Sequence, residues 1–180
     1  MLEVLKQILR VGIIRRTRRK PTPAPPADPA ARAIGRAACI RHTDTGSCNG
    51  CELEIHALSN AFHNIEADGL RFVASPRHAD LLLVTGPVTP HMHEALERTW
   101  AAMPEPKRLL AVGDCAIDGG IFGQGYASLG GVAQVLEVDA TVPGCPPAPE
   151  AILEGIRRAL AVERRSPVPT DPSAPPADKL

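Results

Sequence analysis

Short apolar runs alternate with segments of helical spacing through the middle of this chain. The runs at 80–85 and 108–113 read Asp-Leu-Leu-Leu-Val-Thr and Arg-Leu-Leu-Ala-Val-Gly, and their apolar residues are consecutive. Consecutive apolar residues are typical of parallel strands that helices cover on both faces. The pattern therefore predicts an α/β fold of the flavodoxin-like type, with an open, mostly parallel sheet and helices on both faces.

The same pattern predicts the order of the elements. Strands are expected at 37–42, 71–74, 80–85, 108–113 and 134–139, and helices at 51–64, 90–102 and 148–162. A glycine-rich loop follows the strand at 108–113. These elements place one folded α/β domain at residues 35–163.

The two ends of the chain differ from this domain in composition. Apolar residues at mostly helical spacing in 1–14 precede the basic cluster Arg15–Lys20, so an amphipathic basic helix is predicted over 1–20. It is shorter than the roughly 20 apolar residues that span a bilayer, and we expect it to dock on a membrane surface or another subunit. Residues 21–34 are predicted to form a proline-rich linker and 164–180 a disordered tail.

Composition disfavours a nucleic-acid partner. Lys and Arg together number 20, as do Asp and Glu, and aromatic residues make up 3% of the chain. The chain therefore has no net excess of positive charge and too few aromatic side chains for rows of stacked bases. Five cysteines are an odd number and no cleavable signal peptide is recognised, so we expect reduced, cytoplasmic thiols. The arginines in 15–19 are not interpreted as an export signal, because prolines follow them.

Four of the five cysteines lie on turns built from glycine or proline. Cys48 and Cys51 occur in Gly-Ser-Cys-Asn-Gly-Cys, Cys115 in Gly-Asp-Cys and Cys145 in Pro-Gly-Cys-Pro-Pro. Three of these turns follow predicted strands, and parallel strands bring their carboxyl ends to one edge of a sheet. Glycine permits close backbone approach, and iron-sulfur clusters are held by four thiolates. The turns fit a cluster cradle, whereas Cys39, within an apolar strand, is expected in the core.

Three other interpretations stay open from the residues alone. Cys48 and Cys51, between a strand and a helix, also fit a dithiol oxidoreductase. A structural zinc site usually shows two paired knuckles, and this chain has one pair. Cys115 and Cys145 would also be compatible with small buried hydrophobic residues, although their turn positions favour that less.

The motifs resemble those of the iron-sulfur small subunit of membrane-bound, formate hydrogenlyase-type [NiFe] hydrogenases, in the family of the complex I 20 kDa subunit, which is the B-type component of NADH-quinone oxidoreductase. Four stretches carry the resemblance and together span most of the predicted domain: 46–54, 75–86, 113–120 and 143–147. Complex I members typically have two adjacent cysteines. The spaced pair Cys48-Asn-Gly-Cys51 instead resembles the hydrogenase branch.

This resemblance implies one 4Fe-4S cluster on Cys48, Cys51, Cys115 and Cys145, and no catalytic residue in this chain. It implies an electron-transfer subunit that relays electrons between a ferredoxin-like subunit and the NiFe large subunit. The complex would be peripheral at the cytoplasmic face of the inner membrane, with the N-terminal helix docked on an integral membrane subunit. The alternative is a complex I-like subunit that works with a 49 kDa-like subunit and delivers electrons to quinone.

Two carboxylates follow Cys51 on the predicted helix. In the family, the position of Glu54 lies at the interface with the large subunit, so a proton-relay role is open for it, against an exposed or capping role. Glu52 is expected only as a first-turn charge that complements the helix dipole. Arg77 and His78 are expected in a loop, either solvated or near the cluster, where a cation would raise its reduction potential.

The remaining candidates concern the surface. His91 and His93 point to different sides of a helix and are expected to be surface residues, not a metal pair. The loop Gly119–Tyr126 has four glycines but not the order of a dinucleotide fingerprint. We expect it to close over the cluster or to meet the large subunit.

Overall fold

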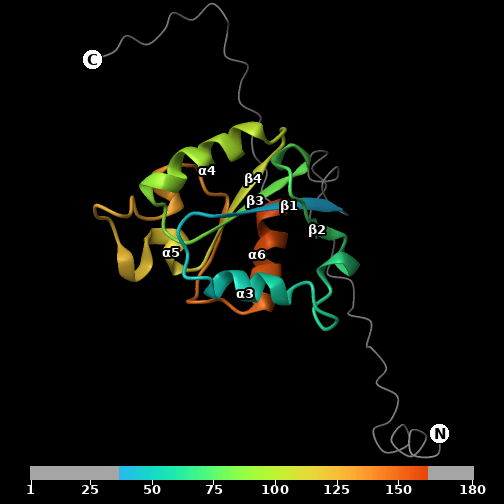
Figure 1. Cartoon of the computed structure of the whole chain (residues 1–180). Helices are drawn as coiled ribbons and strands as arrows, with labels where there is room; N and C mark the ends of the chain where they lie inside the picture. The colour runs from blue at the N-terminus through green and yellow to red at the C-terminus, as the bar shows by residue number, and fades with distance from the viewer. Residues whose placement is uncertain (1–36, 162–180) are drawn as a thin grey trace, which may run out of the picture.

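Five parallel strands form one sheet in the order β2-β1-β3-β4-β5 (Figure 1). They are β1 (Ala38–Asp44), β2 (Leu70–Phe72), β3 (Leu81–Thr85), β4 (Arg108–Val112) and β5 (Ala140–Val142). This is the strand order of flavodoxin-like folds, so the predicted fold class is confirmed. The computed structural model describes residues 37–161. The predicted helix 1–20, the linker 21–34 and the tail 164–180 lie outside the described residues.

Helices cover both faces of the sheet (Figure 1). They are α3 (Gly50–Ala57), α4 (Pro90–Ala102), α5 (Asp114–Asp118) and α6 (Pro149–Ala161), joined by four short 3-10 turns, η1 (Ile65–Asp68), η2 (Pro76–His78), η3 (Gly120–Phe122) and η4 (Val132–Gln134). On the face of α3 and α6, the core includes Ile40, Leu83, Leu110, Ile152 and Ile156. On the face of α4, it includes Leu82, Val84, Leu96, Leu109 and Ala111.

The central strands β3 and β4 are buried at every residue. This explains their consecutive apolar residues, because helices remove both faces of these strands from water. None of the helices within residues 37–161 combines the length and the apolar content that crossing a membrane requires.

The helix predicted over 51–64 is wrong in its second half, since α3 ends at Ala57. The Asn60 side chain accepts hydrogen bonds from the backbone N–H groups of Phe62 and His63, at 2.8 and 2.9 Å. Asn64 then adopts a left-handed conformation with φ 42°. Asparagine side chains that bond the local backbone compete with the helix, and here they replace its last turns with a loop.

The strand predicted over 134–139 is also wrong, because β5 begins only at Ala140. The preceding segment contains η4, and Val132, Val135, Leu136 and Val138 pack into the core on the α4 face. Pairing with β4 starts at Asp139, whose N–H donates to the Leu109 carbonyl at 3.0 Å and whose carboxylate accepts from Leu109 N–H at 2.7 Å. Apolar content alone therefore misplaced the strand.

Candidate functional site

All four turn cysteines lie past the carboxyl ends of strands, at one edge of the sheet. Cys48 and Cys51 follow β1, Cys115 follows β4 and Cys145 follows β5. Cys48 and Cys145 are exposed, Cys51 and Cys115 are partly buried, and all are free thiols. The predicted placement at the carboxyl edge is confirmed for the backbone of each turn.

Glycines bring these turns into contact. A Cβ on Gly113, just before Cys115, would lie 2.6 Å from the Cys51 sulfur, and one on Gly120 would lie 3.1 Å from the Cys115 sulfur. A Cβ on Gly50 would lie 3.6 Å from the Cys48 sulfur and 3.8 Å from Pro146, the neighbour of Cys145. A side chain at any of these positions would crowd a cysteine sulfur.

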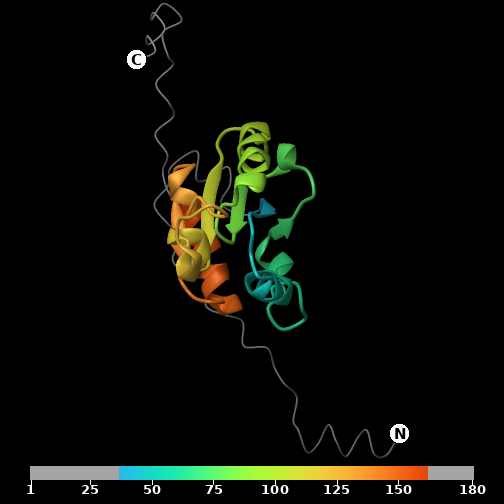
Figure 2. The same cartoon turned by 60° about the vertical axis from the view of Figure 1, so that its left-hand side comes forward.

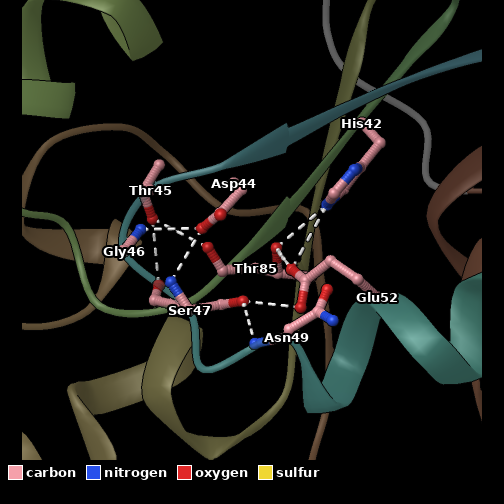
Figure 3. A network of polar contacts seen from close by, with 9 residues as sticks. His42, Asp44, Thr45, Gly46, Ser47, Asn49, Glu52 and Thr85 are labelled. Carbon is pink, nitrogen blue, oxygen red and sulfur yellow. Dashed lines mark hydrogen bonds and ion pairs between the residues drawn. The ribbon is translucent and has the colours of Figure 1, made fainter.

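The first turn is fixed by polar contacts to its own strand and to β3 (Figure 3). The Asp44 carboxylate accepts hydrogen bonds from the N–H groups of Gly46 and Ser47, at 2.8 and 2.7 Å. The buried Thr45 hydroxyl lies 2.9 Å from the carbonyl of Thr85 and 3.0 Å from that of Gly86, within donating distance of either. A Cβ on Gly86 would lie 2.3 Å from the Ser47 nitrogen, so β3 and this turn approach more closely than any other residue allows.

The turns of Cys115 and Cys145 are tied to each other. Gly113 N–H donates to the Val142 carbonyl at 2.8 Å, and Asp114 N–H donates to the Gly144 carbonyl at 3.0 Å. In return, the Asp114 carboxylate accepts from Gly144 N–H at 2.7 Å. Asp114 in Gly-Asp-Cys therefore joins the Cys115 turn to the Cys145 turn across 30 residues of sequence.

The thiols also act on one another electrostatically. Burial raises the pKa of the Cys51 thiol to about 12, with further contributions from the charges of Glu52, Cys48, Cys115 and Cys145. Burial likewise raises the pKa of Cys115, again with help from Cys145 and Cys48. Negative charge on the neighbouring sulfurs therefore opposes ionisation of Cys51 and Cys115.

Glu52, expected only as a helix-dipole charge, lies at the centre of a polar network (Figure 3). It is 8% exposed, and its carboxylate accepts hydrogen bonds from the hydroxyls of Ser47, at 2.5 Å, and Thr85. The His42 Nε2 atom lies 2.9 Å from the Thr85 hydroxyl and 3.6 Å from Glu52. Burial is the main cause that lowers the pKa of His42, while the charges of Glu52 and Asp44 oppose it.

Glu54 is partly buried and makes no hydrogen bond or ion pair with residues 37–161. Arg77 and His78 are exposed in η2, which precedes β3 and so lies at the amino edge of the sheet, away from the cysteines. Of the two alternatives expected for them, the structure agrees with solvated loop residues and not with a place beside a cluster. Cys39 is only partly buried and absent from both cores, which corrects the prediction that it packs in the core.

His91 is exposed and His93 forms an ion pair with Glu97 at 3.4 Å, on the same helix, as expected of surface residues. The loop after α5 presents large apolar side chains to solvent. Ile121 is 88% exposed, Phe122 56% and Tyr126 fully. Figure 2 brings this side of the molecule forward.

The residues at this edge include four free cysteines, and four cysteines are the ligand set of iron-sulfur clusters. Within residues 37–161, no three His, Cys, Asp or Glu side chains surround one point as a metal ion would require. A zinc site needs four ligands within about 2.0–2.3 Å of one ion. A 4Fe-4S cluster is held by four cysteines, and here glycines stand against the sulfurs of Cys48, Cys51 and Cys115.

Fold and site together define a flavodoxin-like α/β domain with a cysteine-lined edge of the kind that holds an iron-sulfur cluster. The chain belongs to the family described as NADH ubiquinone oxidoreductase, 20 kDa subunit, whose model matches residues 48–159. The resemblance recognised in the motifs is thereby confirmed.

Relatives come from more than one kind of oxidoreductase. The chain is 43% identical over 127 residues to the probable membrane-bound hydrogenase subunit mbhJ of Pyrococcus furiosus, covering 71% of this chain and 76% of that protein. It is 43% identical over 131 residues to formate hydrogenlyase subunit 7 of Escherichia coli, covering 73% and 51%. It is 46% identical over 108 residues to an NADH-quinone oxidoreductase subunit of Desulfovibrio desulfuricans, covering 60% and 58%.

Solved structures agree on the fold. A chain of the membrane-bound sulfane sulfur reductase, an archaeal respiratory membrane complex, superposes with a TM-score of 0.63 at 34% identity and 72% coverage of both chains. A chain of an NAD+-reducing [NiFe]-hydrogenase superposes with a TM-score of 0.55 at 22% identity, covering 75% of this chain and 98% of that one. The second likeness concerns the fold alone.

Proposed function

We propose that this chain is an electron-transfer subunit of a membrane-bound hydrogenase complex and that Cys48, Cys51, Cys115 and Cys145 hold one 4Fe-4S cluster. When bound, such a cluster takes up and releases single electrons. The observation that supports this best is the approach of three cysteine turns at one sheet edge, where Gly113 leaves no room for a side chain against Cys51.

The residues around the thiols have separate tasks in this proposal. Cys51 is the second residue of α3, where unpaired backbone N–H groups and the positive end of the helix dipole favour an anionic group. Asp44 and Thr45 hold the turn of Cys48 and Cys51, and Asp114 holds the turns of Cys115 and Cys145 together. The chain binds and orients the electron carrier, and a catalytic centre belongs to a partner.

The exposed loop after α5 is the proposed contact with that partner. Its apolar residues Ile121, Phe122 and Tyr126 lie directly after Gly120, which contacts Cys115. Beside it is an open hollow of about 280 Å³ lined by residues of the first cysteine turn, the end of β3 and this loop: Gly46, Pro87, Thr89, Phe122, Gly125, Tyr126, Ala127 and Ser128. Apolar side chains beside a redox site are suited to a large subunit that excludes water there.

The relatives favour a hydrogenase-type complex, with a quinone-linked complex as the alternative. Two are named as hydrogenase or formate hydrogenlyase subunits and one as a quinone oxidoreductase subunit. The spaced pair Cys48 and Cys51 supports the hydrogenase branch. A ferredoxin-like subunit would supply or receive the electrons, and an integral membrane subunit would hold the complex peripherally at the cytoplasmic face.

The test is to purify the complex anaerobically through a tag on this chain and to measure iron, acid-labile sulfide, nickel and the co-purifying subunits. We expect about four iron and four sulfide per chain, lost in Cys115→Ser and retained in the matched control Cys39→Ser, whose thiol lies on β1 away from the site. A Cys115→Ser protein with full iron and sulfide would refute the ligand assignment. Iron without nickel would move the assignment to the quinone-linked alternative.

A further inference from the structure

Helix α3 carries two glutamates with different surroundings. Glu52 is 8% exposed and its two carboxylate oxygens accept hydrogen bonds from different elements, one from Ser47 on the cysteine turn and one from Thr85 at the end of β3. Glu54, two residues later, is partly buried and makes no such contact with residues 37–161. Only Glu52 is fixed in one position.

The hydrogen bonds form a directed chain. Thr85 gives its only hydroxyl proton to Glu52, so its oxygen accepts from His42, whose Nε2 lies 2.9 Å away and must carry hydrogen. The Ser47 hydroxyl likewise donates its hydrogen bond to Glu52, and its oxygen accepts a hydrogen bond from Asn49 N–H at 3.1 Å. Every neighbour donates toward Glu52, which is the arrangement that an ionised carboxylate requires.

This carboxylate also neighbours the first cysteine pair in sequence. Ser47 precedes Cys48 and Glu52 follows Cys51, so the Ser47–Glu52 hydrogen bond joins the two ends of the segment that carries both cysteines. The buried Glu52 carboxylate is therefore held one residue from Cys51, in a position that its two hydrogen bonds fix.

We propose that Glu52 is a positioning residue that orders the first cysteine turn and, as a fixed buried charge, lowers the reduction potential of the cluster. An electron added beside a fixed negative charge is less stable than one added beside a neutral group, and burial limits the screening by water. The inference rests on the proposed function, because it needs a cluster bound at Cys51.

The experiment compares Glu52→Gln with the matched control Glu54→Gln in the anaerobically purified complex. Each protein is assayed for iron and sulfide, and its midpoint potential is measured by a redox titration followed by electron paramagnetic resonance. We expect Glu52→Gln to keep iron and sulfide and to have a more positive midpoint potential, Glu54→Gln to match the wild type, and Glu52→Asp, which retains the charge, to restore most of the shift.

Several results would overturn the inference. A fully loaded Glu52→Gln complex with an unchanged or more negative potential would do so, as would an equal shift in Glu54→Gln or no restoration in Glu52→Asp. Loss of iron from both Glu52→Gln and Glu52→Met would show that Glu52 is required for assembly and does not set the potential. A wild-type complex without iron and sulfide would instead refute the proposed function itself.

Discussion

Gly113→Ala tests whether the fold requires the close approach of the Cys115 turn to Cys51. Gly113 has φ 89° and ψ 152°, a conformation that side chains adopt only under strain. Such a conformation costs about 1–3 kcal/mol in a non-glycine residue. The new Cβ would lie 2.6 Å from the Cys51 sulfur, and overpacking of this kind costs about 1–3 kcal/mol more.

The two costs together amount to about 2–6 kcal/mol, compared with a total stability of roughly 5–15 kcal/mol for a typical domain. A loss of about 4 kcal/mol would lower Tm by roughly 15 °C. The clash also displaces the Cys51 sulfur, so we expect the iron content to fall together with stability.

The assay is thermal and urea unfolding of the anaerobically purified full-length chain, with iron and sulfide measured on the same samples. Gly125→Ala is the matched control, because a Cβ there meets no atom within 4 Å and the residue has no positive φ. A change within about 0.5 kcal/mol is expected for the control. Equal stability of Gly113→Ala and Gly125→Ala would refute the reasoning.

Two further predictions concern the same edge. Asp114→Ala should lower the free energy of unfolding by about 1–2 kcal/mol, since it leaves Gly144 N–H without its acceptor at 2.7 Å. Urea unfolding would be compared with that of Glu150→Ala, a variant of an exposed residue. Equal stability of the two variants would show that the Asp114 hydrogen bond contributes nothing. In cluster-free protein, Cys51 should react with iodoacetamide much more slowly than the exposed Cys48 and Cys145. Burial and the neighbouring charges raise its pKa from 9.0 to about 12, so its thiolate fraction at pH 8 falls about a thousandfold and recovers only as pH rises. Peptide mapping by mass spectrometry over a range of pH would detect equal labelling, which would contradict this.

The parallel sheet and the carboxyl-edge position of the cysteines could be predicted because both follow from local patterns. Consecutive apolar residues marked β3 and β4, and glycine-bounded cysteines marked the turns after β1, β4 and β5. Parallel topology then required those turns to share an edge. No distance between thiols had to be known.

The position of β5 and the end of α3 could not be predicted in the same way. Both depend on single side chains that bond backbone groups. The Asp139 carboxylate accepts a hydrogen bond from Leu109 N–H, and the Asn60 side chain accepts hydrogen bonds from backbone N–H groups in the loop after α3. Apolar content around 132–138 indicated a strand, but those residues reach the core without pairing. Burial and hydrogen bonding are separate requirements, and periodicity reports only the first.

The burial of Glu52, which its expected role at the start of the helix did not include, follows from the phase of α3. Buried Ile55 is three residues after Glu52, so the two side chains share the helix face that packs on the sheet. Leu53 is 64% exposed, so the apolar residues of this helix do not all face the core. The apolar pattern therefore did not indicate which side of the helix is buried. A glutamate on the packed face needs buried donors, and Ser47 and Thr85 are the residues that supply them. The two hydroxyls come from segments that lie far apart in the sequence, so the fold had to be known before Glu52 could be recognised as a buried, hydrogen-bonded carboxylate.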